Sequence, residues 1–327
     1  MKLLLYEWCC SGGLSGAEAS ADLAGIVAEG RAMLEALAAD AARDALLEVT
    51  VLVDVTQAPE LPVAARVRSV PAGGEIDALV AAARDADWTV IVAPETDGIL
   101  FDRVGAVRAA GARVLAASDP FIAIAADKQA TVNALAAAGV PVPAGRSLAA
   151  GESVPLDFHM PAIRKLRDGV GGEGLALLAS IHDAQPAPMA TRLEAFAAGT
   201  PVGVSCLCGG GVVKVLPPMV QRFTPSMPPR YLGGEPLAPG LQADRAIALA
   251  RRAVRAVARA AGDDAPMGWV GVDMILGARD DGRDDRVLEV NPRLTTSFVR
   301  HATAASQSLV RRMLEMAAGL QVHDGAR

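Results

Sequence analysis

The chain has 327 residues, of which 52% are hydrophobic, and a formal net charge of −6. This length indicates two or three domains, and an acidic chain without a basic run gives no reason to expect a nucleic-acid partner. No window reaches about 18 uncharged apolar residues, and Glu7 interrupts the short apolar start, so neither a membrane span nor a signal peptide is predicted. We therefore expect a cytoplasmic protein without a membrane partner.

Strands and helices alternate through the first 118 residues. The expected elements are a strand at 1–8, a helix at roughly 18–41, a strand at 47–55, a helix at 75–86, a strand at 87–95, a helix near 99–110 and a strand at 113–118. Alternation of this kind predicts an α/β domain, and near-continuous apolar strands are typical of a parallel sheet with both faces covered.

Candidate ligand contacts follow two of these strands. Ligands of such sheets bind beyond the carboxyl ends of the strands. Gly12 and Gly13 in "EWCCSGGL" and Glu95 in "APETDGIL" occupy such positions, so they are candidate substrate contacts. An ordinary turn is the alternative interpretation of the two glycines.

The four cysteines are Cys9, Cys10, Cys206 and Cys208. They do not form the disulfide framework of a small secreted domain. A zinc site built from all four is one interpretation, although the CC and CxC spacings lack the usual loop of such sites. Buried free thiols are the other interpretation.

A helix is predicted from about residue 127 to 138, since Gly139 and Pro141 follow as a helix stop. Asp127 fits the start of this helix. Lys128 does not, because a cation in the first turn opposes the positive end of the helix dipole. Lys128 is therefore either solvated or bound to an anion that the helix end also attracts.

The stretch "HMPAIRKLRDGVGGEGLALL" predicts a short strand that ends near Lys165, followed by a loop with Gly169, Gly171, Gly172 and Gly174. Such a loop presents backbone N–H groups and can fold over phosphates. A flexible linker is the alternative, but a linker would be longer and richer in serine. The strand, the lysine and the glycine loop together favour phosphate.

Further along, strands are expected at 201–208 and 212–216, and a helix at 242–261. The arginines of this helix, among them Arg251 and Arg255, are interpreted as a solvated face.

The segment "GWVGVDMILGARDDGRDDRVLEVNPR" (268–293) predicts a hairpin, because Asp281-Gly282 is a turn signal between two apolar runs. Symmetric pairing about position 281 places Asp273 opposite Glu289. Asn291 then lies on the same face as Glu289, since side chains alternate along a strand. Oxygen ligands of this kind predict a Mg²⁺ site that shares phosphate oxygens and water. A polar strand face that simply meets water is the alternative.

These pieces have one joint explanation. Lys128 and Lys165 could grip the phosphates of a nucleotide while the glycine loop closes over them. The hairpin could hold Mg²⁺ against the same phosphates, and Arg293 could neutralise charge on a phosphorylated intermediate.

In order along the chain, the motifs "DK" with "GVPVP", "AIRKLRDGVGGEG", "EAFAAG", "GVDMIL" and "LEVNPR" resemble the ATP-grasp superfamily of carboxylate–amine ligases. The resemblance implies an N-terminal parallel α/β domain followed by two α+β lobes that clasp ATP. The implied divisions are an N-terminal domain at 1–118, an ATP-grasp N-terminal lobe with the glycine lid loop at 119–195, and a C-terminal lobe with the Mg²⁺-binding hairpin at 196–327.

The resemblance also implies roles for individual residues. The ATP contacts would be Lys128, Lys165, Gly171, Gly172, Glu194, Phe196 and Ala197; the ligands of two Mg²⁺ ions, with Mn²⁺ as an alternative, would be Asp273, Glu289 and Asn291; and the catalytic residues would be Arg293 and Lys165. Many members carry an acidic residue for the ribose shortly after the hinge glycine. Thr200 and Pro201 stand there, so this chain departs from that pattern.

The stretches "NPRLTTS", "APETDGIL" and "YEWCCSGGL" are similar to the tyramine–L-glutamate ligase group of methanofuran biosynthesis. A bacterial counterpart would serve methylofuran in one-carbon metabolism. Thr295, Thr296 and Ser297 lie just past the expected metal ligands, so they are expected at the acyl-phosphate and acceptor end. Aromatic residues are few, and Trp8, which adjoins the "CCSGG" turn, is a candidate stacking partner for the amine. A ligase for another amino acid or glutamate-adding substrate, and an ATP-binding module without turnover, are the alternatives. A homodimer is common in the superfamily.

Overall fold

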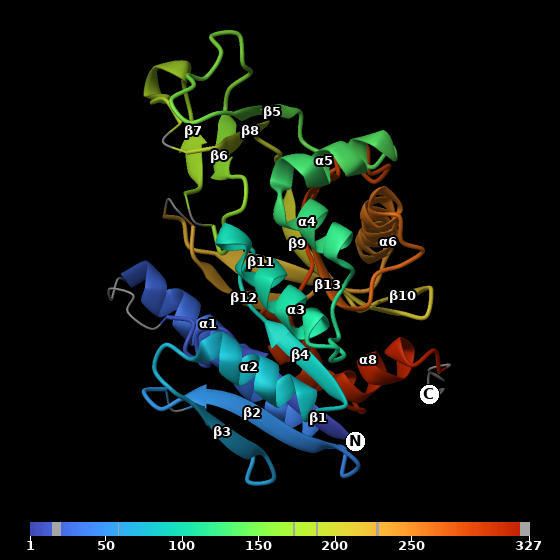
Figure 1. The fold of residues 1–327 in the computed structure, drawn as a ribbon. Helices are drawn as coiled ribbons and strands as arrows, with labels where there is room; N and C mark the ends of the chain where they lie inside the picture. Colours follow the sequence, from blue (N-terminus) through green and yellow to red (C-terminus); the bar gives the residue numbers. More distant parts are fainter. Residues whose placement is uncertain (15–20, 58, 173, 188, 227–228, 321–327) are drawn as a thin grey trace.

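The computed structural model describes residues 1–14, 21–57, 59–172, 174–187, 189–226 and 229–320. Within them the strands form three sheets (Figure 1). The first sheet has the order β3-β2-β1-β4, with β1 (Lys2–Glu7), β2 (Glu48–Asp54), β3 (Arg66–Val70) and β4 (Trp88–Val92). Every pair in it is parallel, as the alternation of strands and helices predicts.

Helices cover both faces of this sheet. Leu3 and Leu5 of β1 pack with α1 (Ala21–Ala41), whereas Leu4 and Tyr6 pack with α2 (Glu75–Arg84) and α3 (Ile99–Ala109). Successive side chains of a strand point to opposite faces, so an unbroken apolar run is what a sheet covered on both sides requires. A short 3-10 helix, η1 (Thr96–Gly98), links β4 to α3.

The predicted strand at 113–118 is wrong. Only one isolated parallel bridge forms there, between Thr89 and Val114. The chain leaves the sheet because Ser118 caps α4 (Asp119–Ala126) and Pro120 occupies its first turn. The strand missing from the prediction is β3, an exposed edge strand whose "RVRSV" sequence lacks the apolar run that identifies buried strands.

The second sheet is antiparallel and small. Its order is β5-β8-β6-β7, with β5 (Gly145–Leu148), β6 (Ala162–Leu166), β7 (Ala176–Leu178) and β8 (Thr191–Ala195); the 3-10 helix η2 (Ile181–Asp183) lies between β7 and β8. Its apolar cluster, which includes Leu148, Ala162 and Leu193, is separate from the two larger cores. Figure 1 shows this sheet standing away from the rest of the chain.

The third sheet contains β9 (Thr200–Gly209), β10 (Val212–Val215), β11 (Met219–Phe223), β12 (Tyr231–Pro236), β13 (Gly268–Leu276) and β14 (Arg286–Asn291). Its main path is β12-β11-β9-β13-β14, and β10 pairs with β9. The long helix α6 (Leu241–Ala261) packs against it and ends at Gly262, whose left-handed φ of 78° suits a glycine cap.

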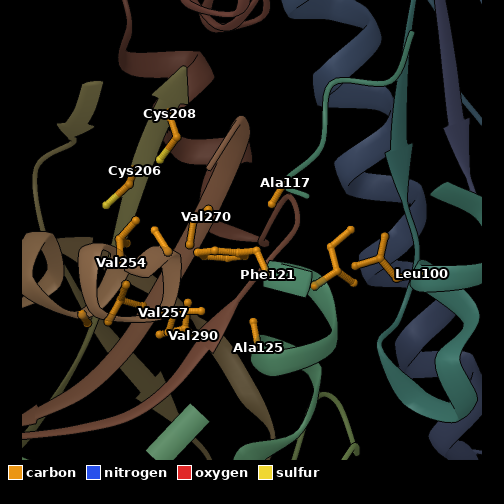
Figure 2. Close-up of a cluster of buried hydrophobic side chains, with 14 of the residues drawn as sticks. Leu100, Ala117, Phe121, Ala125, Cys206, Cys208, Val254, Val257, Val270 and Val290 are labelled. Carbon is orange, nitrogen blue, oxygen red and sulfur yellow. The ribbon is translucent and has the colours of Figure 1, made fainter. Parts of the chain in front are cut away.

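A shared core joins the first and third sheets. Figure 2 shows Phe121 of α4 beside Val270 of β13, with Leu100 of α3 to one side and Val254 and Val257 of α6 to the other. On the opposite side of the first sheet, α7 (Ser297–Ala304) and α8 (Leu309–Ala317) pack with α1. The second sheet therefore has its own core, whereas the other two are packed as one body.

The three sheets fall within the three divisions expected from the sequence. However, α4 and α5 (Lys128–Ala137) pack against α6 and β14 of the third division. The boundaries therefore stay a prediction. In the part of the chain that the structure describes, no helix is both long and apolar enough to cross a membrane.

Candidate active site

A cavity of about 470 Å³ lies where the second and third sheets face each other. Nearly all the candidate site residues line it, although they come from segments far apart in the sequence. They are Glu95, Lys128, Lys165, Gly171, Gly172, Glu194, Phe196, Ala197, Asp273, Glu289, Asn291, Arg293, Thr295, Thr296 and Ser297.

The β13–β14 hairpin supplies two carboxylates that face each other. Asp273 pairs with Glu289, and Gly271 pairs with Asn291, so the predicted register is correct at this end of the hairpin. The register then slips, because Met274 pairs with Val287. The symmetric pairing predicted about position 281 therefore holds only for the part of the hairpin that carries the polar side chains.

Asp273 is held by two amide side chains. Asn291 donates from Nδ2 to Asp273 Oδ2 at 2.9 Å, and Gln221 of β11 donates from Nε2 to Asp273 Oδ1 at 2.7 Å. Gly203 of β9 lies opposite Asp273, and a Cβ there would approach Gln221 Nε2 to 2.9 Å. Gln221 is not among the predicted site residues, because β11 is a short strand that the sequence pattern does not predict.

The two carboxylates differ in their electrostatic surroundings. Burial, together with the charge of Glu289, raises the pKa of Asp273. Burial also acts to raise the pKa of Glu289, but the charges of Lys128 and Lys165 outweigh it and lower that pKa. Facing carboxylates repel each other, so a divalent cation between them would relieve the repulsion.

Lys128 is not solvated, which removes one of its two interpretations. It is 9% exposed, and its Nζ lies 3.6 Å from Glu289 Oε2 and donates a hydrogen bond to the carbonyl oxygen of Gly169. Asp127 caps α5 as predicted, by accepting hydrogen bonds from the backbone N–H groups of Gln129 and Ala130. The lysine at the positive end of this helix therefore faces the cavity and touches the glycine loop.

Lys165 belongs to a buried ionic network. Its Nζ lies 2.9 Å from Glu194 Oε2, and Arg192 Nε donates to Glu194 Oε1 at 2.6 Å. Lys165 also donates to the carbonyl oxygen of Leu288 at 3.2 Å. Leu288 is the residue skipped in the β13–β14 register, and a bulge of this kind frees backbone groups from the ladder. Arg192, which is 1% exposed, is not among the predicted site residues.

The other expected nucleotide contacts are also in the cavity wall. Phe196 and Ala197 follow β8 and connect the second sheet to β9, and Phe196 is 49% exposed. Gly171 and Gly172 line the cavity from the loop between β6 and β7. Both glycines have positive φ angles, 61° and 81°, which permit the loop to turn tightly.

Arg293 follows the hairpin and binds Glu95, which lies after β4 at the N-terminal cap position of η1. Its Nε donates to Glu95 Oε2 at 2.8 Å, and both side chains are largely buried. The hydroxyls of Thr295 and Ser297 lie 2.8 Å apart, and Ser297 is the same distance from Ser205 of β9. This end of the cavity thus combines a guanidinium group with a row of hydroxyls.

Three expected substrate contacts do not meet at the cavity. Gly12 lies against Asp54 and Val70, and Trp8 packs directly over Gly13, so neither glycine lines the cavity. Trp8 does not line it either. These glycines permit close packing within the first domain, which agrees with the ordinary-turn interpretation.

All four cysteines are free and buried, which agrees with the thiol interpretation. Burial and the neighbouring charge of Glu7 raise the pKa of the Cys9 thiol.

The donor set fits Mg²⁺ bound together with phosphates. Among the described residues, no group of three or more His, Cys, Asp or Glu side chains comes together to hold a metal. The cavity offers instead two facing carboxylates and the amide of Asn291. Mg²⁺ is usually bound through one or two carboxylates and completes its shell with water and phosphate oxygens. The lysines beside these carboxylates suit the same phosphates.

The lysines, the facing carboxylates and the glycine loop of this cavity suit a nucleotide bound with its metal ion. The family model described as the ATP-grasp domain matches residues 125–297, and that of the pre ATP-grasp 3 domain matches residues 47–122. The chain belongs to the ATP-grasp family. Proteins of this family are ATP-dependent ligases, so ATP-dependent ligation is the class of activity that fold and family support. No match was found among curated proteins.

Solved structures show the same fold. A protein of the ATP-grasp superfamily from Archaeoglobus fulgidus is 23% identical with a TM-score of 0.70, over 98% of this chain and 89% of that chain. N5-carboxyaminoimidazole ribonucleotide synthetase from Thermotoga maritima is 18% identical with a TM-score of 0.65, over 99% of this chain and 77% of that chain. D-alanine–D-alanine ligase from Bacillus anthracis, complexed with ATP, is 15% identical with a TM-score of 0.63, over 97% of this chain and 97% of that chain.

Proposed function

We propose that the chain joins the side-chain carboxylate of L-glutamate to tyramine or a related primary amine, with conversion of ATP to ADP and phosphate. The observation that carries the proposal is the cavity in which the facing Asp273 and Glu289 lie beside two buried lysines. The similarity of "NPRLTTS" and "APETDGIL" to the tyramine–L-glutamate ligase group supports the choice of substrates. A role in methylofuran-type cofactor synthesis is part of the same proposal.

In such a reaction, different residues of the cavity bind the phosphates, the base and the metal ions. Lys128 and Lys165 hold phosphate oxygens by charge, while Phe196 and Ala197 contact the base from the hinge after β8. Asp273, Glu289 and Asn291 would hold two Mg²⁺ ions, which neutralise charge on the phosphates. ATP would supply the phosphoryl group that activates the substrate carboxylate as an acyl phosphate.

Arg293 and the glycine loop act on the activated carboxylate. Arg293 stabilises negative charge on the acyl phosphate, because its guanidinium group lines the cavity just beyond Asn291. The loop with Gly171 and Gly172 excludes water, which would otherwise hydrolyse that species. The amine nitrogen then forms the C–N bond, phosphate leaves, and a proton is released. This scheme needs no nucleophilic side chain from the protein.

Trapping with hydroxylamine tests the activation step. The full chain is mixed with ATP, Mg²⁺, L-glutamate and hydroxylamine, and both ADP and glutamyl hydroxamate are measured. We expect both to form, and Asp273→Asn to lower the rate at least about a hundredfold, a loss of about 3 kcal/mol in transition-state stabilisation. Asp281→Asn, at the exposed tip of the same hairpin, is the matched control and should stay within about twofold of the wild type.

The substrate assignment needs a panel of acceptors. Tyramine should stimulate ADP release and give a product with the mass of the glutamyl amide. Full turnover by the Asp273→Asn variant would contradict the proposed role of Asp273 in Mg²⁺ binding. ADP release that depends on amino acids and on no amine would favour an amino-acid ligase instead. An L-amino acid ligase from Bacillus licheniformis has a similar fold, at 14% identity and a TM-score of 0.62 over 92% of this chain and 69% of that one.

A further inference from the structure

Glu95 and Arg293 both line the cavity, and one carboxylate oxygen of Glu95 has no hydrogen-bond partner among the described residues. Glu95 is 5% exposed, and its Oε2 accepts the hydrogen bond from Arg293 Nε. Its Oε1 is buried in the cavity wall and accepts no hydrogen bond from any residue that the structure describes. A buried acceptor left without a donor costs about 1–3 kcal/mol, so this oxygen is suited to a donor from a bound molecule.

A second carboxylate at the cavity lacks a cation. Of the charged side chains that line the cavity, three carboxylates form ion pairs with Lys128, Lys165 and Arg293. Among the described residues, the two left without such a pair are Asp273, in the proposed metal site, and Glu29 of α1. Burial raises the pKa of Glu29, and the charge of Arg293 opposes this shift. Beyond the metal site, Glu29 is thus the cavity carboxylate that forms no ion pair among the described residues.

An aromatic surface lines the same cavity. Phe223 of β11 and Tyr231 of β12 both line it, with ring centroids 5.8 Å apart in an edge-to-face arrangement. Burial raises the pKa of the Tyr231 hydroxyl, a hydrogen bond with Thr296 opposes this shift, and the charges of Asp273 and Glu29 add to it. Tyr231, Glu29 and Asp273 all line the cavity. Phe223 remains 40% exposed, which leaves ring surface for a ligand.

We propose that Glu29, Glu95 and the Phe223–Tyr231 pair form a binding site for the acceptor substrate, a protonated primary amine with a flat apolar body. The ammonium group donates to Glu95 Oε1 and lies beside Glu29, and the apolar body packs on the two rings. A charged hydrogen bond in a partly buried site and an aromatic contact each contribute to affinity. This inference rests on the proposed function, because it names the residues that bind the acceptor amine of that reaction.

Equilibrium binding tests the site without turnover. The full chain with ADP and Mg²⁺ is titrated in a calorimeter with 2-phenylethylamine, 2-phenylethanol and 3-phenylpropionate, which share the ring but differ in charge. We expect the amine to bind at least about tenfold more tightly than the alcohol, and the acid to bind more weakly than either. Equal binding of amine and alcohol, or preferred binding of the acid, would overturn the proposal.

Substitution locates the site. Glu29→Gln should weaken binding of 2-phenylethylamine about tenfold, and Phe223→Leu should weaken it severalfold, while circular dichroism verifies the fold of each variant. Glu35→Gln is the matched control on the same helix, since Glu35 accepts a hydrogen bond from the backbone of Glu60 and does not line the cavity. Equal losses in Glu29→Gln and Glu35→Gln would refute the assignment.

The two proposals can fail separately. Loss of hydroxamate formation with intact amine binding would reject ligation of glutamate and leave the amine site. Hydroxamate formation together with no preference for the amine would reject the amine site and leave the ligase.

Discussion

Removal of the Glu194 charge should destabilise the lobe built on the second sheet. Glu194 is 2% exposed, accepts a hydrogen bond from buried Arg192 at 2.6 Å and forms an ion pair with buried Lys165 at 2.9 Å. Glu194→Gln keeps the size of the side chain but leaves those two cations close together without an anion. Loss of one partner from a buried ion pair costs about 3–5 kcal/mol, and the charged hydrogen bond from Arg192 alone contributes about 1.5–3 kcal/mol.

Hydrogen exchange can measure this loss where it occurs. The second sheet has its own small core, so its opening free energy need not equal that of the whole chain. Exchange of β6 and β8 amides, followed by mass spectrometry without nucleotide, should show an opening free energy lower by about 3 kcal/mol or more. The matched control is Glu152→Gln, which breaks the exposed Arg146–Glu152 pair and should change it by less than about 1 kcal/mol.

A double variant tests the physical reason. Arg192→Met in the Glu194→Gln background removes one of the two unbalanced cations, so the double variant should be more stable than Glu194→Gln alone. A Glu194→Gln variant within about 1 kcal/mol of the wild type would refute the reasoning. Additive losses in the double variant would show that the charges do not interact.

Two further predictions concern the third sheet and its neighbours. Burial lowers the pKa of His301 to about 4, so the unfolded chain binds a proton between about pH 6.5 and 4 that the folded chain does not, and stability falls as the pH drops through that range. Urea unfolding should show the wild type losing about 2 kcal/mol more than His301→Leu between pH 7.5 and 5, and equal losses would contradict this expectation. Gly203→Ala should displace Gln221 from Asp273, because the new Cβ would approach Gln221 Nε2 to 2.9 Å. In the hydroxamate assay, the Mg²⁺ concentration that gives half-maximal activity should rise about tenfold. An unchanged concentration would show that Gln221 does not position the carboxylate.

Local sequence patterns predicted the elements of this fold that are long, apolar or marked by a turn. The first parallel sheet, apart from β3, follows from apolar runs such as those of β1 and β4. The pairing of Asp273 with Glu289 follows from a turn signal and the two-residue period of a strand. The patterns failed at 113–118, where a helix cap competes with the sheet, and at β11, whose Gln221 faces a cavity rather than a core.

The sequence by itself determined the fold class and the hairpin that carries the carboxylates, because those depend on periodicity and turn chemistry between neighbours in the chain. Only the tertiary structure decided which groups meet across distant segments. It placed Gln221 on Asp273, Lys165 on Glu194 and Arg293 on Glu95, and it removed Gly12 and Gly13 from the cavity. Such contacts depend on which strands become neighbours and on how the sheets pack, and no local pattern encodes either.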